Sequence, residues 1–216
     1  MSTTFKKSTA REYFESIVIA VILALFIRTW VVQAFKIPTG SMENNLLVGD
    51  HLLVNKFVFG PTATALERAI LPVRAIERGD VIVFKYPQEP ERDFIKRVIG
   101  LPGETLEWRR KRIYINGALL DETRFHLQFL SPPAPEGTVS FDLKDNYGPV
   151  TIPPAHYFVM GDNRDNSADS RVWNFLPATY VKGKALMIYW SYDPDAQGFA
   201  SFLTATRWSR LFHQIH

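Results

Sequence analysis

DVIVFKYP at residues 80–87 and DFIKRVIG at residues 93–100 are two short runs dense in valine, isoleucine and aromatic residues. Each begins at a charged residue and ends at proline or glycine, which is typical of strands bounded by turns. Similar runs occur at residues 51–60, 112–117, 156–162 and 183–192. Because no long segment with a 3.6-residue period separates them, the sequence predicts a mostly β fold with antiparallel strands.

The composition is that of a folded chain with one sizeable core. Of the 216 residues, 46% are hydrophobic and 13% are aromatic, which excludes an intrinsically disordered protein. The net charge of +3 does not indicate a nucleic-acid partner. The basic cluster RRKR, at residues 109–112, is interpreted as a solvated hairpin tip. With no cysteine in the chain, disulfides, thiolate zinc sites and cysteine nucleophiles are excluded.

An uncharged run, SIVIAVILALFI at residues 16–27, follows the basic residues Lys6, Lys7 and Arg11. We predict a transmembrane anchor helix over residues 10–35, with residues 1–9 in the cytoplasm and the remainder exported. The alternative is a cleavable signal peptide, since VQA at residues 32–34 resembles a cleavage site. Arg28 and Trp30, between the apolar core and that site, favour the uncleaved anchor.

The rest of the chain is predicted to be an extracytoplasmic β-rich domain over residues 36–195, followed by a tail. A proline-rich stretch at about residues 121–154 is interpreted as an inserted smaller β subdomain. In the tail, residues 196–216, apolar side chains recur near helical spacing with arginines between them. This pattern predicts a basic amphipathic helix that lies either on a membrane surface or on the protein's own core.

Several kinds of site are excluded by spacing. The five histidines are scattered without metal-ligand spacing. The stretch GDNRDNSADSR at residues 161–171 fails as a calcium loop, because Arg164 occupies a ligand position and Trp173 the place of the final glutamate. There is no phosphate-binding glycine loop, and no G-x-S-x-G motif surrounds Ser41.

A serine and a lysine remain as candidate catalytic residues. Ser41 lies in KIPTGSMENNLLVGD, residues 36–50, where Pro38 and Gly40 constrain and expose the backbone. Lys96 lies in the predicted strand at residues 93–100, on the same face as apolar residues. A lysine can act as a base only when burial lowers its pKa, whereas most strand lysines are solvated.

Four ordered stretches resemble the conserved boxes of the bacterial type I signal peptidases. They are IPTGSMENNLLVGD at residues 37–50, RGDVIVFKYP at 78–87, DFIKRVIGLPGE at 93–104 and GDNRDNSADSR at 161–171. The chain departs from the family pattern at Asn44 and Asn45, where Pro-Thr is usual. It also has Thr39 where many relatives have serine.

The resemblance implies a role for individual residues. Ser41 matches the nucleophile and Lys96 the general base, and the Thr39 hydroxyl with the Ser41 N–H matches the oxyanion hole. Ser167 matches the hydroxyl that orients the lysine amine. Asp169 and Arg171 resemble a structural pair that holds the segment containing Ser167. Four apolar residues resemble the lining of shallow pockets for small side chains; they are Ile37, Met42, Leu46 and Ile95.

The function implied by the resemblance is that of a membrane-bound serine endopeptidase with neither metal nor cofactor. It would remove signal peptides after Ala-x-Ala-like sites, as a single-pass protein of the bacterial inner membrane with a functional link to the secretion translocon. The expected partners are signal peptides of exported preproteins and the lipid bilayer, not nucleic acid. Three alternatives are a self-cleaving protease of the SOS-repressor type, an adapter without activity, and a peptidase specialised for particular substrates.

Overall fold

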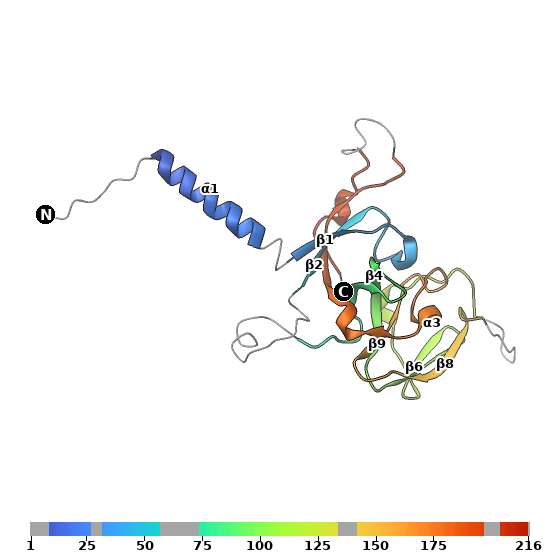
Figure 1. The fold of residues 1–216 in the computed structure, drawn as a ribbon. Coiled ribbons are helices and arrows are strands. Elements are labelled where there is room, and N and C mark those ends of the chain that lie inside the picture. Colours follow the sequence, from blue (N-terminus) through green and yellow to red (C-terminus); the bar gives the residue numbers. More distant parts are fainter. Residues whose placement is uncertain (1–8, 27–31, 57–73, 134–141, 197–203, 216) are drawn as a thin grey trace.

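A helix followed by two antiparallel β-sheets makes up the described part of the chain (Figure 1). The computed structural model describes residues 9–26, 32–56, 74–133, 142–196 and 204–215. The predicted fold class, mostly β with antiparallel strands, is confirmed.

The larger sheet carries the segments that resemble the family boxes. Its strands in spatial order are β1 (Val32–Lys36), β2 (Asp50–Asn55), β11 (Val181–Ser191), β3 (Val81–Tyr86), β4 (Glu89–Gly100), β9 (His156–Met160) and β10 (Leu176–Pro177). A further short strand, β12 (His213–Gln214), pairs with β11. Strand β4 therefore lies inside the sheet between β3 and β9, where it can bury side chains on both faces.

The smaller sheet begins earlier than predicted. It contains β7 (Ala118–Leu119), β6 (Arg112–Ile115), β5 (Thr105–Arg109) and β8 (Asn146–Thr151) in that order. The prediction of an inserted subdomain over about residues 121–154 is therefore wrong at its start, because three of the four described strands precede residue 121. Two tight turns, at residues 110–111 and 116–117, provide the β5–β6 and β6–β7 connections.

The basic cluster at residues 109–112 does form a hairpin tip, but one of its residues is not solvated. Lys111 has a positive φ of 60° and a buried side chain. Its amine donates hydrogen bonds to both carboxylate oxygens of Asp165, at 2.6 and 2.7 Å. This ion pair ties the smaller sheet to the segment that follows β9.

The N-terminal helix is shorter than predicted. Helix α1 spans Thr9–Phe26 and none of its residues is buried. No helix in the described part of the chain is long and apolar enough to cross a membrane. The prediction of one helix over residues 10–35 is wrong at its C-terminal end, because Val32–Lys36 form β1 and pair with His51–Asn55 of β2. This pairing satisfies the backbone groups of β1 that face β2, and Phe35 packs on the core.

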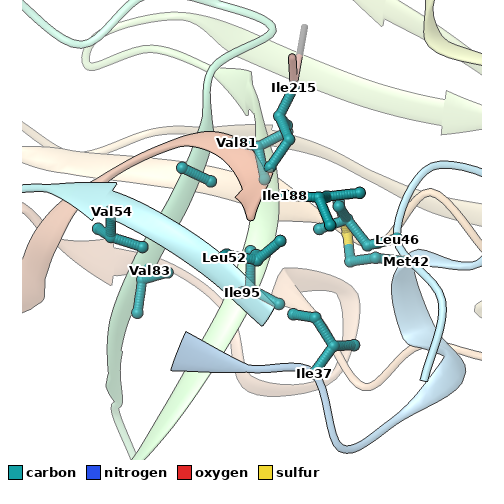
Figure 2. Packing of buried hydrophobic residues seen from close by; sticks show 11 residues of the cluster. Ile37, Met42, Leu46, Leu52, Val54, Val81, Val83, Ile95, Ile188 and Ile215 are labelled. Atoms are coloured by element: carbon teal, nitrogen blue, oxygen red, sulfur yellow. The ribbon is translucent and has the colours of Figure 1, made fainter. Parts of the chain in front are cut away.

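Much of the core beneath β1, β2, β3 and β11 comes from residues far apart in the sequence. Figure 2 shows its apolar side chains converging from strands and from the turn that follows β1; they include Ile37, Met42, Leu46, Leu52, Ile95, Ile188 and Ile215. Met42, Leu46 and Leu52 have no exposed surface. The turn after β1 is therefore anchored to the sheet by its own apolar side chains.

Residues 205–215 of the C-terminal segment do not form a continuous helix. Its regular structure there is the one-turn 3₁₀ helix η5 (Trp208–Arg210) and strand β12; residues 197–203 lie outside the described part. Ile215 is buried in the core, while Trp208 and Phe212 are exposed. Among these residues, Ile215 therefore packs on the protein's own core, whereas Trp208 and Phe212 do not.

Two arginines join this segment to the loop after residue 41. Arg210 pairs with the buried carboxylate of Asp50 at 2.6 Å and donates to the carbonyl of Asn45 at 2.7 Å. Arg207 donates to the carbonyl of Val48 at 2.9 Å. The segment thus closes over the loop through charged and backbone contacts that an amphipathic pattern does not reveal.

Replacing Arg210 with alanine should destabilise the fold by about 3 kcal/mol, because the buried Asp50 carboxylate loses its ion-pair partner. Chemical denaturation of the detergent-solubilised protein measures this change. Arg109→Ala is the matched control, since its ion pair with Glu107 is long and largely exposed and should be worth less than about 1 kcal/mol. Equal effects of the two substitutions would contradict the structural role of Arg210.

Candidate active site

Ser41 lies in a short 3₁₀ turn within the loop that connects β1 to β2. The 3₁₀ helix η2 spans Gly40–Met42 and is preceded by Thr39 in an extended conformation. The Glu43 N–H closes the turn by donating to the Gly40 carbonyl at 3.1 Å. Because the next side chain, Met42, is fully buried, the turn is pinned to the core while Ser41 stays half-buried at its edge.

Lys96 extends from β4 to this serine. Its Nζ lies 2.7 Å from Ser41 Oγ and donates to the Ile95 carbonyl at 2.9 Å. Only 3% of the residue is exposed. The amine also lies 5.4 Å from the ring centre of Phe94, two residues before it on the same face of the strand. Chain segments 55 residues apart thus bring a hydroxyl and an amine into hydrogen-bond contact.

Burial lowers the pKa of Lys96 to about 8. Removing the ammonium from water is the main cause, and the nearby carboxylates of Asp169 and Asp162 oppose it by raising the pKa. With this pKa, about a tenth of the molecules carry a neutral amine at pH 7 and half of them at pH 8. A neutral amine can accept the proton that the Ser41 hydroxyl donates.

The segment after β9 lies directly against Ser41. The Asn163 N–H donates to the Ser41 carbonyl at 3.1 Å, and a side chain at Gly161 would collide with that carbonyl and with Ser167 Oγ. Asp169 accepts a hydrogen bond from the Gly161 N–H at 3.1 Å and pairs with Arg171 at 2.9 Å. This buried ion pair holds the segment in the close approach that glycine permits.

A second buried ion pair, between Arg97 and Asp162, lies behind the serine and lysine. The two side chains share two hydrogen bonds, at 2.8 and 2.7 Å, with 1% and 0% exposed. Arg97 follows Lys96 in β4 and faces the other way, and the N–H of Asp162 contacts Met42 Sδ at 3.4 Å. Sequence reasoning did not select this pair, although a charged residue on each face of an apolar strand was a visible signal.

Asn45 connects the loop after Ser41 to the Arg97–Asp162 ion pair. Its amide donates to Asp162 Oδ2 at 2.7 Å and to the Phe125 carbonyl at 3.1 Å. Asn44, just before it, adopts a left-handed conformation with φ of 77°. Side-chain hydrogen bonds therefore constrain the loop where most family members have Pro-Thr.

Ser167 and Thr39 lie near Ser41 and Lys96, the proposed catalytic dyad, without hydrogen bonds to either residue in the structure. Ser167 Oγ is buried and has no partner among the described residues. Thr39 is exposed and makes no hydrogen bond that caps η2. The amine of Lys96 donates a hydrogen bond to the Ile95 carbonyl.

A cavity of about 490 Å³ opens beside the serine and lysine. Its lining comes from the turn, from β4 and from the segment after β9: Pro38, Thr39, Gly40, Ser41, Arg92, Asp93, Phe94, Ile95, Lys96, Asn166 and Ala168. A neighbouring cavity of about 30 Å³ is lined by Ile37, Pro38, Ile95 and five other residues. These volumes suit an extended peptide with small side chains.

Two of the four residues predicted to line the pockets do not do so. Ile37 and Ile95 border the cavities, but Met42 and Leu46 point into the core and line neither one (Figure 2). The 3₁₀ helix η2 turns the chain after Ser41, so the side chain of Met42 faces the core. No group of three or more His, Asp or Glu side chains able to hold a metal exists in the described ranges.

A buried amine in contact with a serine hydroxyl, on a β-scaffold, fits the site of a serine hydrolase. The chain belongs to the signal peptidase family, peptidase S26, whose family model matches residues 10–190. It is therefore a hydrolase of the serine peptidase class.

Named relatives agree with the family match. The chain is 36% identical to a signal peptidase I of Pseudomonas aeruginosa, covering 88% of this chain and 76% of that protein. It is 34% identical to a signal peptidase I of Aquifex aeolicus, covering 84% of each. A crystal structure of a signal peptidase I from Enterococcus faecalis is 35% identical, with a TM-score of 0.40 over 51% of this chain and 97% of that one.

Lys96→Met should stabilise the protein at neutral pH, because the wild-type fold holds an ammonium that burial disfavours. The drop of the pKa from 10.5 to about 8 corresponds to roughly 3 kcal/mol at pH 7. Between about pH 8 and pH 10.5 the unfolded chain binds the proton that the folded chain has lost, so wild-type stability rises with pH and the advantage of Lys96→Met shrinks.

Denaturation midpoints of wild type and Lys96→Met between about pH 7 and pH 10.5 measure this effect. Lys85→Met, at an exposed position of the neighbouring strand β3, is the control and should show no such pH-dependent difference. A difference between wild type and Lys96→Met that does not vary with pH would contradict a depressed pKa.

Proposed function

We propose that this chain is a signal peptidase I that cleaves signal peptides from exported preproteins, with Ser41 as nucleophile and Lys96 as general base. The observation that carries the proposal is the 2.7 Å contact between Lys96 Nζ and Ser41 Oγ at the wall of a peptide-sized cavity. Membership of the signal peptidase family supports the substrate class.

In the first step, neutral Lys96 accepts the proton of the Ser41 hydroxyl as Ser41 Oγ attacks the scissile carbonyl. The carbonyl oxygen becomes an oxyanion, which the N–H of Ser41 and the hydroxyl of Thr39 stabilise by donating hydrogen bonds. The lysine then delivers its proton to the leaving amine, and an ester joins the signal peptide to Ser41. In the second step Lys96 accepts a proton from water, which hydrolyses the ester.

The supporting residues act on the lysine and on the segment beside it. The Ile95 carbonyl binds one hydrogen of the Lys96 amine, which leaves another available for Ser167 Oγ. We assign Ser167 this orienting role because its hydroxyl is buried and without a partner among the described residues. Asp169 and Arg171 keep the segment in place through their buried ion pair.

The cavities favour substrates with small side chains near the scissile bond. Ile37, Pro38 and Ile95 border the smaller cavity, which is shallow and lined mainly by apolar side chains. Ile95 and Pro38 also border the larger cavity that contains Ser41. This arrangement supports cleavage after Ala-x-Ala-like sequences.

We further propose that α1 anchors the protein in the bacterial inner membrane, with the β-domain outside the cytoplasm. Support comes from the absence of any buried residue in α1 and from the exposure of nine large apolar side chains from Phe14 to Phe26. Figure 1 shows α1 extending away from the sheets. Such an anchor would place Ser41 near the bilayer surface, where signal peptides leave the secretion translocon, and would raise their local concentration.

Cleavage should depend on both members of the dyad. A preprotein with an Ala-x-Ala boundary is incubated with detergent-solubilised wild type, Ser41→Ala or Lys96→Met, and mass spectrometry locates the cut. Wild type should cut after the last alanine, and each variant should lose at least about 10³-fold in rate, because nucleophile or base is missing. Lys85→Met, outside the cavity, is the matched control for a lysine-to-methionine change. Substantial cleavage by either dyad variant would refute the assignment.

The pH dependence of kcat/KM should follow the neutral form of Lys96. The rate should rise with pH and level off above about 8, because burial lowers the pKa of the base to that value. Initial rates between about pH 6 and pH 10 test this. A profile that is flat below pH 8, or one that still rises tenfold per unit at pH 9, would exclude a lysine base with this pKa.

A further inference from the structure

One asparagine, Asn163, contacts both peptide groups that flank Ser41, one through its side chain and the other through its backbone. The side-chain amide of Asn163 donates to the Gly40 carbonyl at 3.1 Å, and its backbone N–H donates to the Ser41 carbonyl at 3.1 Å. The same amide donates to Glu43 Oε2 at 3.2 Å. Since a carbonyl and a carboxylate can only accept, the NH₂ group of Asn163 must face the turn.

The carbonyl of Gly40 and the N–H of Ser41 belong to one trans peptide group. In a trans peptide these two groups point in opposite directions within a plane, so fixing the carbonyl also fixes the N–H. The Gly40 carbonyl receives two hydrogen bonds, from Glu43 N and from Asn163 Nδ2, which occupy both of its lone pairs. The Ser41 N–H is the proposed backbone donor of the oxyanion hole.

Gly40 makes this restraint necessary. Glycine leaves the peptide plane on either side of it unusually free to rotate. The turn hydrogen bond from Glu43 comes from within the loop and can move with it, whereas Asn163 belongs to a segment held by the buried Asp162–Arg97 and Asp169–Arg171 pairs. Asn163 itself is 1% exposed.

We propose that Asn163 is a positioning residue for catalysis: by holding the Gly40 carbonyl, it aims the Ser41 N–H at the oxyanion. This inference rests on the proposed function. Asn163 does not touch the dyad amine or border the cavity beside it. Its effect should therefore fall on the rate of the bond-making step and leave substrate binding and the lysine base unchanged.

The test compares wild type, Asn163→Ala and Glu43→Ala in the full-length, detergent-solubilised protein. Asn163→Ala should lower kcat at least tenfold, up to the 10²–10³-fold typical of a lost oxyanion donor, with KM unchanged within about twofold. The rise of kcat/KM near pH 8 should stay in place. Glu43→Ala removes the other acceptor of the Asn163 amide but keeps its bond to Gly40, so kcat should change less than about twofold.

Nuclear magnetic resonance can observe the peptide group directly. Gly40–Ser41 is the one Gly-Ser pair in the sequence, so carbonyl-¹³C glycine with ¹⁵N serine yields a single correlated signal. In Asn163→Ala this signal should shift or broaden as the peptide group loses its restraint, while Glu43→Ala should leave it near the wild-type position.

Three outcomes would overturn the inference: a kcat for Asn163→Ala equal to wild type, a reduced kcat with an unmoved Gly40–Ser41 signal, or equal losses in Asn163→Ala and Glu43→Ala. The proposed function is tested separately, because it requires only that wild type cleaves the preprotein and that Ser41→Ala does not. Wild-type cleavage with unchanged activity in Asn163→Ala would refute the positioning role alone.

Discussion

The burial of one lysine amine is the constraint on which the site depends. An ammonium with 3% of its residue exposed is unfavourable, and the same desolvation lowers its pKa to about 8. The cost to folding and the larger fraction of neutral amine near neutral pH are therefore one physical effect. Strands β3 and β9, on either side of β4, exclude water from Lys96, and the Ser41 turn covers its end. The rest of the fold has to offset this cost, which the large apolar core makes possible.

The two buried ion pairs beside the lysine have an electrostatic role as well as a structural one. Asp162 and Asp169 both raise the pKa of Lys96 and so oppose burial. Each carboxylate is already paired, with Arg97 and with Arg171 respectively. An unpaired carboxylate in this low-dielectric region would stabilise the ammonium more strongly and make the base less available. The arginines thus limit the effect of carboxylates that the fold needs for its hydrogen bonds.

Local patterns in the sequence predicted the features that short-range interactions determine, such as strands and the faces of their side chains. The strand periods gave the fold class and the face of Lys96, but the contact of Lys96 with Ser41 was expected from the family resemblance and not from any spacing. The predictions were wrong for segments whose conformation is determined by contacts with distant parts of the chain. Residues 32–36 continue an apolar run and become β1 only because β2 is available to pair with them. The tail has a helical pattern in the sequence, but its position in the structure is fixed by the ion pair between Arg210 and Asp50. Met42 was expected in a pocket because the direction of a 3₁₀ turn is not visible in the sequence.

The order around Ser41 is a property of the whole chain. The turn itself contributes one backbone hydrogen bond, from Glu43 to Gly40, which is too little to hold a three-residue helix that contains glycine. The rest of the loop adds hydrogen bonds from the Asn45 and Leu46 N–H groups to the Met42 carbonyl. Further restraints come from distant parts of the chain: the core packs on Met42, Asn163 binds both flanking carbonyls, and Arg210 binds the Asn45 carbonyl. Each restraint acts on the backbone or on a buried side chain, so the serine hydroxyl and the cavity beside it remain open. A serine held in this way is rigid without being covered, which suits the proposed attack on an extended substrate.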